Sequence, residues 1–195
     1  DVDGTNAMRY HLEQDQSQKQ QGYEAQFTSQ HDGPFNWVAG VFAFQESNDQ
    51  PTRSDIFARG TTTSYVEQDT TAYAAYAQGS YDFNDRLTLT LGGRYSSENK
   101  DFNVVARRDD GSINFTKAMD KTWTRPDWKV MLDYDFSDNV MGYASITTGF
   151  KSGGYNGRGT TFATITPVDA ETLQAYEIGL KTTLLDNRVR LNANY

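Results

Sequence analysis

The chain contains no cysteine among its 195 residues, so neither a disulfide framework nor a thiolate metal site is possible. It lacks any apolar run near the ~20 residues that a membrane-spanning helix requires. The longest run, Trp37 to Phe44, has only the length of a strand. Cations are too few for a nucleic-acid surface, because 18 Lys and Arg stand against 26 Asp and Glu, a net charge of −8. The first residues contain no apolar signal-peptide core, which we interpret as a truncated or processed start.

Aromatic residues, in contrast, are abundant. They make up 13% of the chain, and twelve of them are Tyr, although the mean hydropathy is only −0.74. A transmembrane β-barrel tolerates such a low average, because only alternate residues of its strands face lipid. Aromatic girdles at the two membrane interfaces are typical of these barrels, so the composition is compatible with one.

Three short segments repeat nearly the same turn phrase. They are Asp82 to Arg86, Asp135 to Asn139 and Leu184 to Arg188, and each lies between two segments in which apolar and polar residues alternate. Alternation on both sides of a polar turn indicates a β-hairpin, and its recurrence indicates a repeated hairpin unit.

The alternation predicts eight strands, with a ninth indicated by Met8, Tyr10 and Leu12. Long polar loops are expected between them on the side opposite the short turns. Short turns on one side and long loops on the other are typical of outer-membrane barrels. The predicted strands are 23–28, 37–45, 71–81, 87–95, 128–134, 140–150, 176–181 and 189–195, and the expected loops are 47–68, 103–121 and 151–171.

The phase of the alternation sorts the charges. Every Lys, Arg and Glu within these segments lies on the face opposite the Leu, Val, Ile and Tyr side chains. A cation turned toward lipid near mid-membrane costs about 2–4 kcal/mol, so a membrane barrel must sort its charges in this way. A soluble β-sandwich or lipocalin-like barrel sorts them too, with its apolar face inward. Loop asymmetry and aromatic strand ends favour an all-β, antiparallel transmembrane β-barrel segment of eight or nine meandering strands.

One stretch resembles a known family. The segment from Tyr143 to Asn156 reads YASITTGFKSGGYN and closely resembles a segment of TonB-dependent outer-membrane receptors of the siderophore-receptor type. Matches in the same order as in that family occur at 36–40, 89–95 and 171–181. The resemblance implies a barrel of about 22 strands filled by an N-terminal plug, an architecture found in large outer-membrane transporters.

The same resemblance implies a function and partners. Such receptors lie in the Gram-negative outer membrane among lipid and lipopolysaccharide, bind scarce nutrients, commonly ferric siderophores, and import them with energy passed on by TonB, ExbB and ExbD. The chain contains no plug and no TonB box, so we expect residues 1–195 to be a partial barrel domain that does not transport alone. An unpaired strand edge at Tyr195 also suggests a fragment.

Several residues of the expected loops are candidates for ligand contact. Cations there could bind an anionic siderophore, pair with lipopolysaccharide phosphates, or be neutralised by neighbouring carboxylates. Aromatic side chains there could stack on a ligand. The candidates are Arg107, Arg108, Phe115, Lys151, Tyr155, Arg158 and Phe162.

The family motif itself has a structural interpretation. Glycines within a strand mark a bend, a bulge or a close approach, so these residues are expected to let the strand leave the barrel wall. The motif comprises Gly149, Phe150, Lys151, Ser152, Gly153, Gly154, Tyr155 and Asn156.

No enzymatic, metal or cofactor site is predicted. Residues Asp1 to Thr5 match a phosphatase-type DxDGT motif, but the apolar strand and α/β body that this chemistry needs are missing. His11 and His31 have no ligand spacing. Two alternatives to a transporter fragment stay open, a stand-alone eight-stranded envelope protein and a soluble ligand-binding barrel whose Leu87, Leu89 and Leu91 face is buried.

Overall fold

The computed structural model describes residues 10–30, 32–56, 60–185 and 188–195, and antiparallel strands account for most of them. Within these ranges no helix is long and apolar enough to cross a membrane. The strands are β1 (Tyr10–Gln14), β2 (Ser17–Thr28), β3 (Phe35–Ile56), β4 (Gly60–Asn84), β5 (Leu87–Arg108), β6 (Ile113–Ser137), β7 (Val140–Lys151), β8 (Gly154–Tyr155), β9 (Pro167–Val168), β10 (Glu171–Leu184) and β11 (Val189–Asn194).

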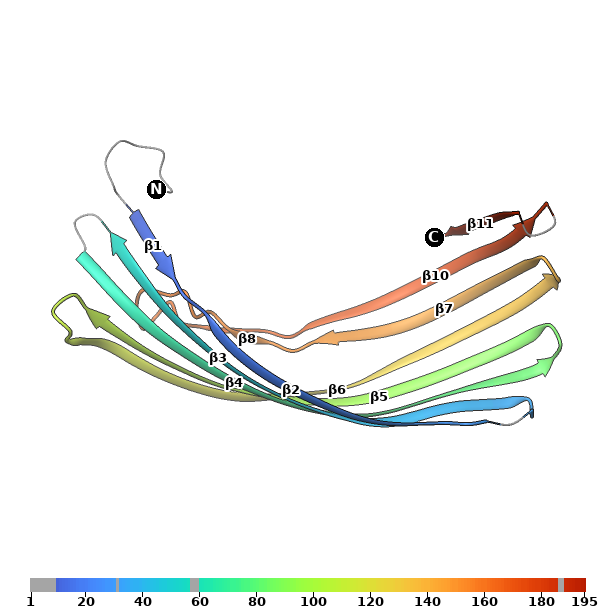
Figure 1. Ribbon diagram of the computed structural model, residues 1–195, viewed down its shortest axis with the longest axis horizontal. Coiled ribbons are helices and arrows are strands. Elements are labelled where there is room, and N and C mark those ends of the chain that lie inside the picture. The colour runs from blue at the N-terminus through green and yellow to red at the C-terminus, as the bar shows by residue number, and fades with distance from the viewer. Residues whose placement is uncertain (1–9, 31, 57–59, 186–187) are drawn as a thin grey trace.

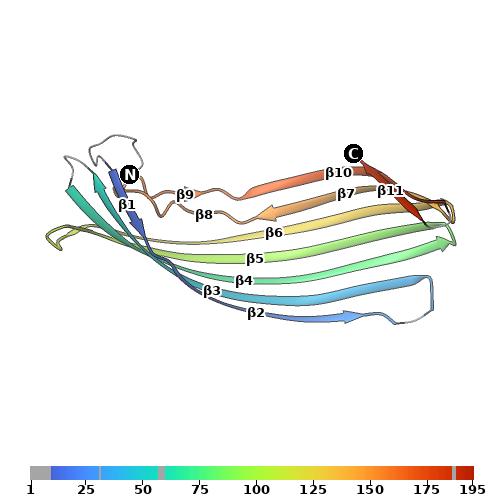
Figure 2. The same cartoon turned by 45° about the horizontal axis from the view of Figure 1, so that its top comes forward.

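Nine of these strands form one curved sheet that follows the chain as a meander. The order is β1-β3-β4-β5-β6-β7-β10-β11, with β2 also pairing β3, while β8 and β9 form a separate small hairpin. Figure 1 shows the sheet bent into a trough, and Figure 2 shows its strands side by side. The predicted all-β, antiparallel, meandering architecture is confirmed.

The predicted strand count is also confirmed. β1 pairs with residues 52–56 of β3 and β2 pairs with residues 38–49 of the same strand, so the two follow each other along one edge. Seven further strands of the sheet correspond to the remaining predicted segments. The ninth strand indicated by Tyr10 and Leu12 is therefore β1, whereas Met8 lies outside the described residues.

The repeated turn phrases lie where they were predicted, at one end of the sheet. They join β4 to β5, β6 to β7 and β10 to β11. In the first turn the Asn84 side chain accepts a hydrogen bond from the Arg86 amide at 2.9 Å, and Asp82 accepts one from the Thr88 hydroxyl at 2.6 Å. Short Asn and Asp side chains favour such turns because they can bond to nearby backbone.

The prediction of a long loop is wrong for two of the three ranges. The ranges 47–68 and 103–121 are largely strand, because β3 continues to Ile56, β4 begins at Gly60, β5 continues to Arg108 and β6 begins at Ile113. The ladder persists there although the outer face becomes polar, and the apolar residues of these ranges, such as Phe102 and Val104, lie on the inner face. No lipid-facing apolar period therefore marks the strand in the sequence. Only 151–171 is a long connection, between β7 and β10.

The two faces of the sheet differ sharply. Strand pairing places an apolar, aromatic band on one face, next to the short turns, and several members are more than half exposed, including Tyr23, Leu91 and Ile178. On β4 this band spans Tyr73 to Phe83, a length that suits a tilted membrane-spanning strand of about 9–11 residues. The band comprises Tyr23, Phe27, Phe35, Trp37, Val41, Tyr73, Tyr81, Phe83, Leu91, Tyr95, Trp128, Val130, Leu132, Tyr134, Phe136, Tyr176, Ile178, Leu180, Val189 and Leu191.

Alongside this band, the charged side chains lie on the opposite, inner face. Glu24, Arg94, Lys129, Glu177 and Lys181 alternate with band residues along their strands, as the phase predicted. A hollow on this face takes its lining from β2 to β7, which identifies it as the concave side of the trough. The soluble alternative required the Leu87, Leu89 and Leu91 face to be buried, yet it lies on the other side and Leu91 is 51% exposed.

Candidate ligand-binding surface

Residues 152–170, which we call the strap, connect β7 to β10 across the inner face. Ile165 is fully buried there, against Phe102 and Val104 of β5 and Val66 of β4, and Phe115, Met119 and Tyr155 pack around this cluster. The strap therefore reaches over β6 to strands that are distant in sequence. Its apolar cluster lies beyond the membrane-length band, at the end of the sheet away from the short turns.

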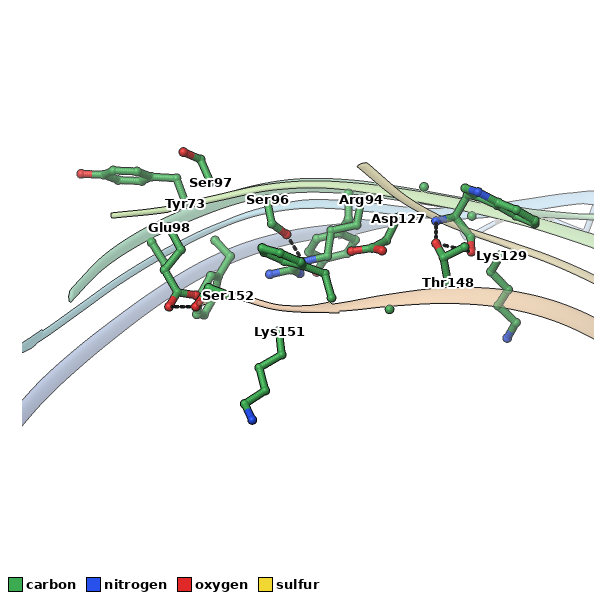
Figure 3. A pocket seen from close by; sticks show the side chains of 18 of the residues that line it. Tyr73, Arg94, Ser96, Ser97, Glu98, Asp127, Lys129, Thr148, Lys151 and Ser152 are labelled. Carbon is green, nitrogen blue, oxygen red and sulfur yellow. Dashed lines mark hydrogen bonds between the residues drawn. The ribbon is translucent and has the colours of Figure 1, made fainter. Parts of the chain in front are cut away.

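Charged side chains hold the strap at its start and again near its middle. The Lys100 ammonium donates to the Gly153 carbonyl at 2.8 Å, and the Ser152 hydroxyl donates to the carboxylate of Glu98, as Figure 3 shows for the second pair. Farther along, the Lys117 ammonium donates to the carbonyls of Ile165 at 2.6 Å and Phe162 at 3.2 Å. Hydrogen bonds from charged donors are stronger than neutral ones, so the strap is held as part of the wall.

Gly153 lets the strap lie close to the sheet and to the Val168 carbonyl oxygen of the strap itself. A Cβ atom at this position would lie 2.8 Å from Cε2 of Trp123, a side chain on the inner face of β6. Real Cβ atoms do not approach other atoms so closely, so only glycine fits without movement of the strap. The family-motif residues Gly149 to Asn156 thus comprise the end of β7 and the departure of the strap from the wall.

Tyr155 and Phe115, two of the predicted contact residues, pack within the protein. The Tyr155 ring lies 5.1 Å from that of Phe102 and 6.1 Å from that of Trp123, and its hydroxyl donates to the Lys100 carbonyl at 3.4 Å. Burial raises the pKa of the Tyr155 hydroxyl, which stays protonated at neutral pH. Phe115 packs against the Ile165 cluster.

Arg107 and Arg108 lie at the tip of the β5–β6 hairpin and bond to their own turn. Arg107 donates to the Gly111 carbonyl at 3.1 Å, and Arg108 donates to the Asn114 side chain at 2.8 Å. Asp110 accepts the Ser112 amide, and hydrogen bonds from the Ser112 hydroxyl and amide hold the pKa of that carboxyl below its usual range. Neither arginine forms an ion pair with Asp109 or Asp110 in the described part of the chain.

The other three candidates differ in their surroundings. Lys151 lies opposite Glu171 on the neighbouring strand and forms an exposed ion pair with it at 3.4 Å. The Phe162 ring is 55% exposed and lies 4.5 Å below the Lys117 ammonium. Arg158 is exposed at the strap tip, where its amide bonds to the Asn156 side chain at 3.2 Å. Tyr155, Arg158 and Phe162 thus share the strap, while Arg107 and Arg108 lie on a separate hairpin.

A hollow of about 980 Å³ lies on the inner face beside the start of the strap. Figure 3 shows Arg94, Glu98, Asp127, Lys129, Thr148 and Ser152 around it. The Arg94 guanidinium lies over the rings of Phe42 and Tyr76, at 5.7 and 5.9 Å, and its Nε donates to Ser96 at 3.0 Å. Cations of this kind, set on aromatic faces in a concave surface, suit a polar ligand or a polar protein surface.

Sequence reasoning missed Lys100, Lys117 and Trp123, which hold the strap. They lie in or beside the range 103–121, which the sequence predicted to be a loop, so their side chains were not predicted to point toward the inner face. Their spacing could have indicated this face, because Lys117, Lys121 and Trp123 are each an even number of residues from Lys129 and so lie on the same side of a continuous strand. Among the described residues, no group of three or more His, Asp or Glu side chains is arranged to hold a metal ion. His31 and the Asp1 to Thr5 motif lie outside those residues.

Comparison with known proteins decides the family. The model of the family described as TonB dependent receptor-like, beta-barrel matches residues 2–195. The chain belongs to this family. TonB-dependent receptors are transport receptors of the Gram-negative outer membrane rather than enzymes.

Individual relatives agree with this assignment. Over 151 residues the chain is 30% identical to the ferric-pyoverdine M114 receptor PbuA of Pseudomonas sp. (strain M114). This alignment covers 74% of the chain and 17% of PbuA. The chain therefore spans about a sixth of the length of that relative.

Solved structures share the fold of this TonB-dependent receptor segment. The ferric yersiniabactin uptake receptor FyuA from Yersinia pestis matches with a TM-score of 0.85 at 19% identity, over 95% of this chain and 29% of FyuA. The ferric-catecholate import receptor Fiu from E. coli K12 matches with a TM-score of 0.66 at 16% identity, over 93% of this chain and 30% of Fiu.

Proposed function

We propose that residues 1–195 are part of the barrel wall of an outer-membrane receptor that binds a ferric siderophore and imports it with energy from TonB. The observation that carries the proposal is the match of the family model to residues 2–195 on a sheet with an apolar outer band and a charged concave face. The relatives named for ferric pyoverdine, ferric yersiniabactin and ferric catecholate support a ferric siderophore as the ligand class.

The geometry indicates what each part of the wall contacts. The outer band contacts lipid, the end of the wall beyond the band contacts lipopolysaccharide and the medium, and the concave face contacts the ligand and a plug. TonB, with ExbB and ExbD, acts through that plug. The exposed strap residues Arg158 and Phe162 are the candidates for first contact with ligand, together with Lys151. Tyr155, Phe115, Arg107 and Arg108 support the wall, because their contacts are internal.

Uptake by the complete protein tests this proposal. The full gene is expressed in a strain that lacks its own siderophore receptors, with and without functional TonB. Accumulation of radioactive iron is measured from ferric complexes of a pyoverdine, yersiniabactin, a catecholate and alcaligin, the last because the alcaligin receptor FauA from Bordetella pertussis shares the fold. We expect TonB-dependent uptake of at least one complex. Uptake of none, or uptake that does not require TonB, contradicts the proposal.

A matched pair of variants tests the strap. Arg158→Gln removes a cation from the inner side, and Lys19→Gln removes one from the outer face of β2. We expect Arg158→Gln to raise the half-saturating ligand concentration by about two- to fivefold, in line with an exposed charged contact, and Lys19→Gln to leave it unchanged. Equal effects of the two variants would remove Arg158 from the ligand contacts.

A further inference from the structure

Basic residues follow one line down the inner face of β6. Pairing with β5 sets Lys117, Lys121, Arg125 and Lys129 on the inner side, opposite Val104, Lys100, Ser96 and Gly92. Neighbouring cations are four positions apart along the strand, a distance of about 13 Å. We call these four residues the β6 cation row. It begins under the strap and ends in the hollow, where Lys129 is visible in Figure 3.

Two members of the row, Lys121 and Lys129, have neither an anionic partner nor a side-chain hydrogen bond among the described residues. Lys117 donates to carbonyls of the strap, and Arg125 lies 3.6 Å from Asp127. Lys121 lies 5.2 Å over the ring of Trp123. Within the described ranges, neither Lys121 nor Lys129 has a carboxylate within 4.0 Å.

The row lies next to further positive charge. Lys121 stands directly opposite Lys100 on β5. Like charges facing each other across a ladder destabilise a sheet, so the arrangement weakens the wall unless a ligand uses it. Lys100 itself contacts Glu98 at 3.1 Å and the Gly153 carbonyl, which leaves Lys121 as the uncompensated member of the pair.

The outer face at the same level has the opposite charge. Asp69, Asp101 and Asp120 stand in register across β4, β5 and β6, and Asp49 and Glu67 face each other one step along β3 and β4. None of these five carboxylates forms an ion pair with another described residue. On β5 and β6 at this level, the inner face carries Lys100, Lys117, Lys121 and Arg125 against the carboxylates of Glu98 and Asp127, so cations outnumber carboxylates there.

We infer that the β6 cation row binds a small, multiply anionic ligand along the path from the strap to the hollow. The inference rests on the proposed function and narrows its ligand to anionic ferric complexes. Ammonium and guanidinium groups form charge-assisted hydrogen bonds with carboxylate and catecholate oxygens. A row of cations on a concave surface attracts ligands of the opposite charge, while the acidic cluster on the outer face repels them from the outside. Lys121 is the first free contact and Lys129 the last.

The competing occupant is the plug, whose acidic side chains would also satisfy the row. The two occupants differ in what happens when the cations are removed. Loss of a ligand contact weakens binding of anions alone, whereas loss of a plug contact lowers the stability of the receptor whatever the charge of the ligand.

Equilibrium binding to the purified complete receptor tests the inference. The probes are two radioactive ferric complexes, a strongly anionic tris-catecholate and an uncharged tris-hydroxamate, each measured at low and high salt. The variants are wild type, the double variant Lys121→Gln with Lys129→Gln, and the control Lys19→Gln on the outer face. Thermal melting of each variant reports on the plug.

We expect the wild type to prefer the anionic complex and to lose affinity as salt rises, because ions screen exposed charges. The double variant should bind the anionic complex about three- to tenfold more weakly, with a smaller salt dependence. It should bind the uncharged complex as before, and Lys19→Gln should match the wild type.

Three results would overturn the inference: no binding of the anionic complex, equal weakening for both complexes, or unchanged binding of the anionic complex by the double variant. Unchanged binding together with a lowered melting temperature would assign the row to the plug. Failure of the proposed function is recognised separately. If the receptor imports iron through TonB but the double variant binds as the wild type does, the inference is wrong and the proposed function stands. If the receptor binds the anionic complex but never imports iron, the proposed function is wrong.

Discussion

Removing the buried side chain of the strap should release the strap without unfolding the wall. Ile165 is 0% exposed and packs on Phe102, Val104 and Val66. Replacing a buried Ile by Ala costs about 2–5 kcal/mol when the cavity persists. Since each 1.4 kcal/mol is a factor of ten, the opening equilibrium of the strap should rise by about thirtyfold at the lower bound. The sheet should keep its stability, because its ladders do not pass through the strap.

Limited trypsin digestion of the complete receptor measures this opening. Arg158 is the only Lys or Arg between residues 152 and 170, so cleavage there reports on the strap. When opening is fast relative to cleavage, the rate follows the open population. We expect faster cleavage at Arg158 in Ile165→Ala than in wild type. The control Val168→Ala, at a residue that is 50% exposed, should change the opening free energy by less than about 0.5 kcal/mol. Equal cleavage of Ile165→Ala and wild type would refute the clamped strap.

Three further predictions concern the strap, a turn and the lipid face. Gly153→Ala should also raise cleavage at the strap, because its Cβ would collide with the Val168 carbonyl oxygen and with Trp123, and unchanged cleavage would contradict this close packing. The lowered pKa of Asp110 means that its carboxylate stabilises the β5–β6 turn above the ordinary pKa of 3.8 and that this stabilisation is lost as the pH falls through the lowered value. The protection of the turn amides from hydrogen exchange, relative to their intrinsic rate at each pH, should therefore fall in acid in wild type but not in Asp110→Asn. Leu132→Arg on the outer band should destabilise the receptor in bilayers by about 2–4 kcal/mol by chemical denaturation, whereas Met131→Arg on the inner face should not.

The membrane half of the wall was predictable from sequence because physics imposes a period there. One face meets lipid and the other meets polar surroundings, so Leu87, Leu89 and Leu91 alternate with Thr88 and Thr90. The turns were predictable because Asn and Asp side chains mark them. These two signals located the strands and their charge sorting.

The outer half of the wall was not predictable in the same way. Between residues 97 and 103 the outward side chains are Ser97, Asn99, Asp101 and Asn103, so nothing apolar recurs and the strand resembles a loop. Its pairing is imposed by the neighbouring strands, which sequence reading does not supply. The same limit applies to the strap, because the burial of Ile165 depends on side chains from two strands far away in sequence.

The central claim is that the apolar face of this sheet contacts lipid and the charged face lines the lumen. Spin labels placed one at a time along residues 128–134 of β6, in a cysteine-free form of the complete receptor in outer-membrane vesicles, test it most directly. Access to dissolved oxygen, which concentrates in lipid, should peak at positions 128, 130, 132 and 134, and access to a water-soluble relaxant should peak at 129, 131 and 133. The opposite phase, or no period of two, would contradict the account.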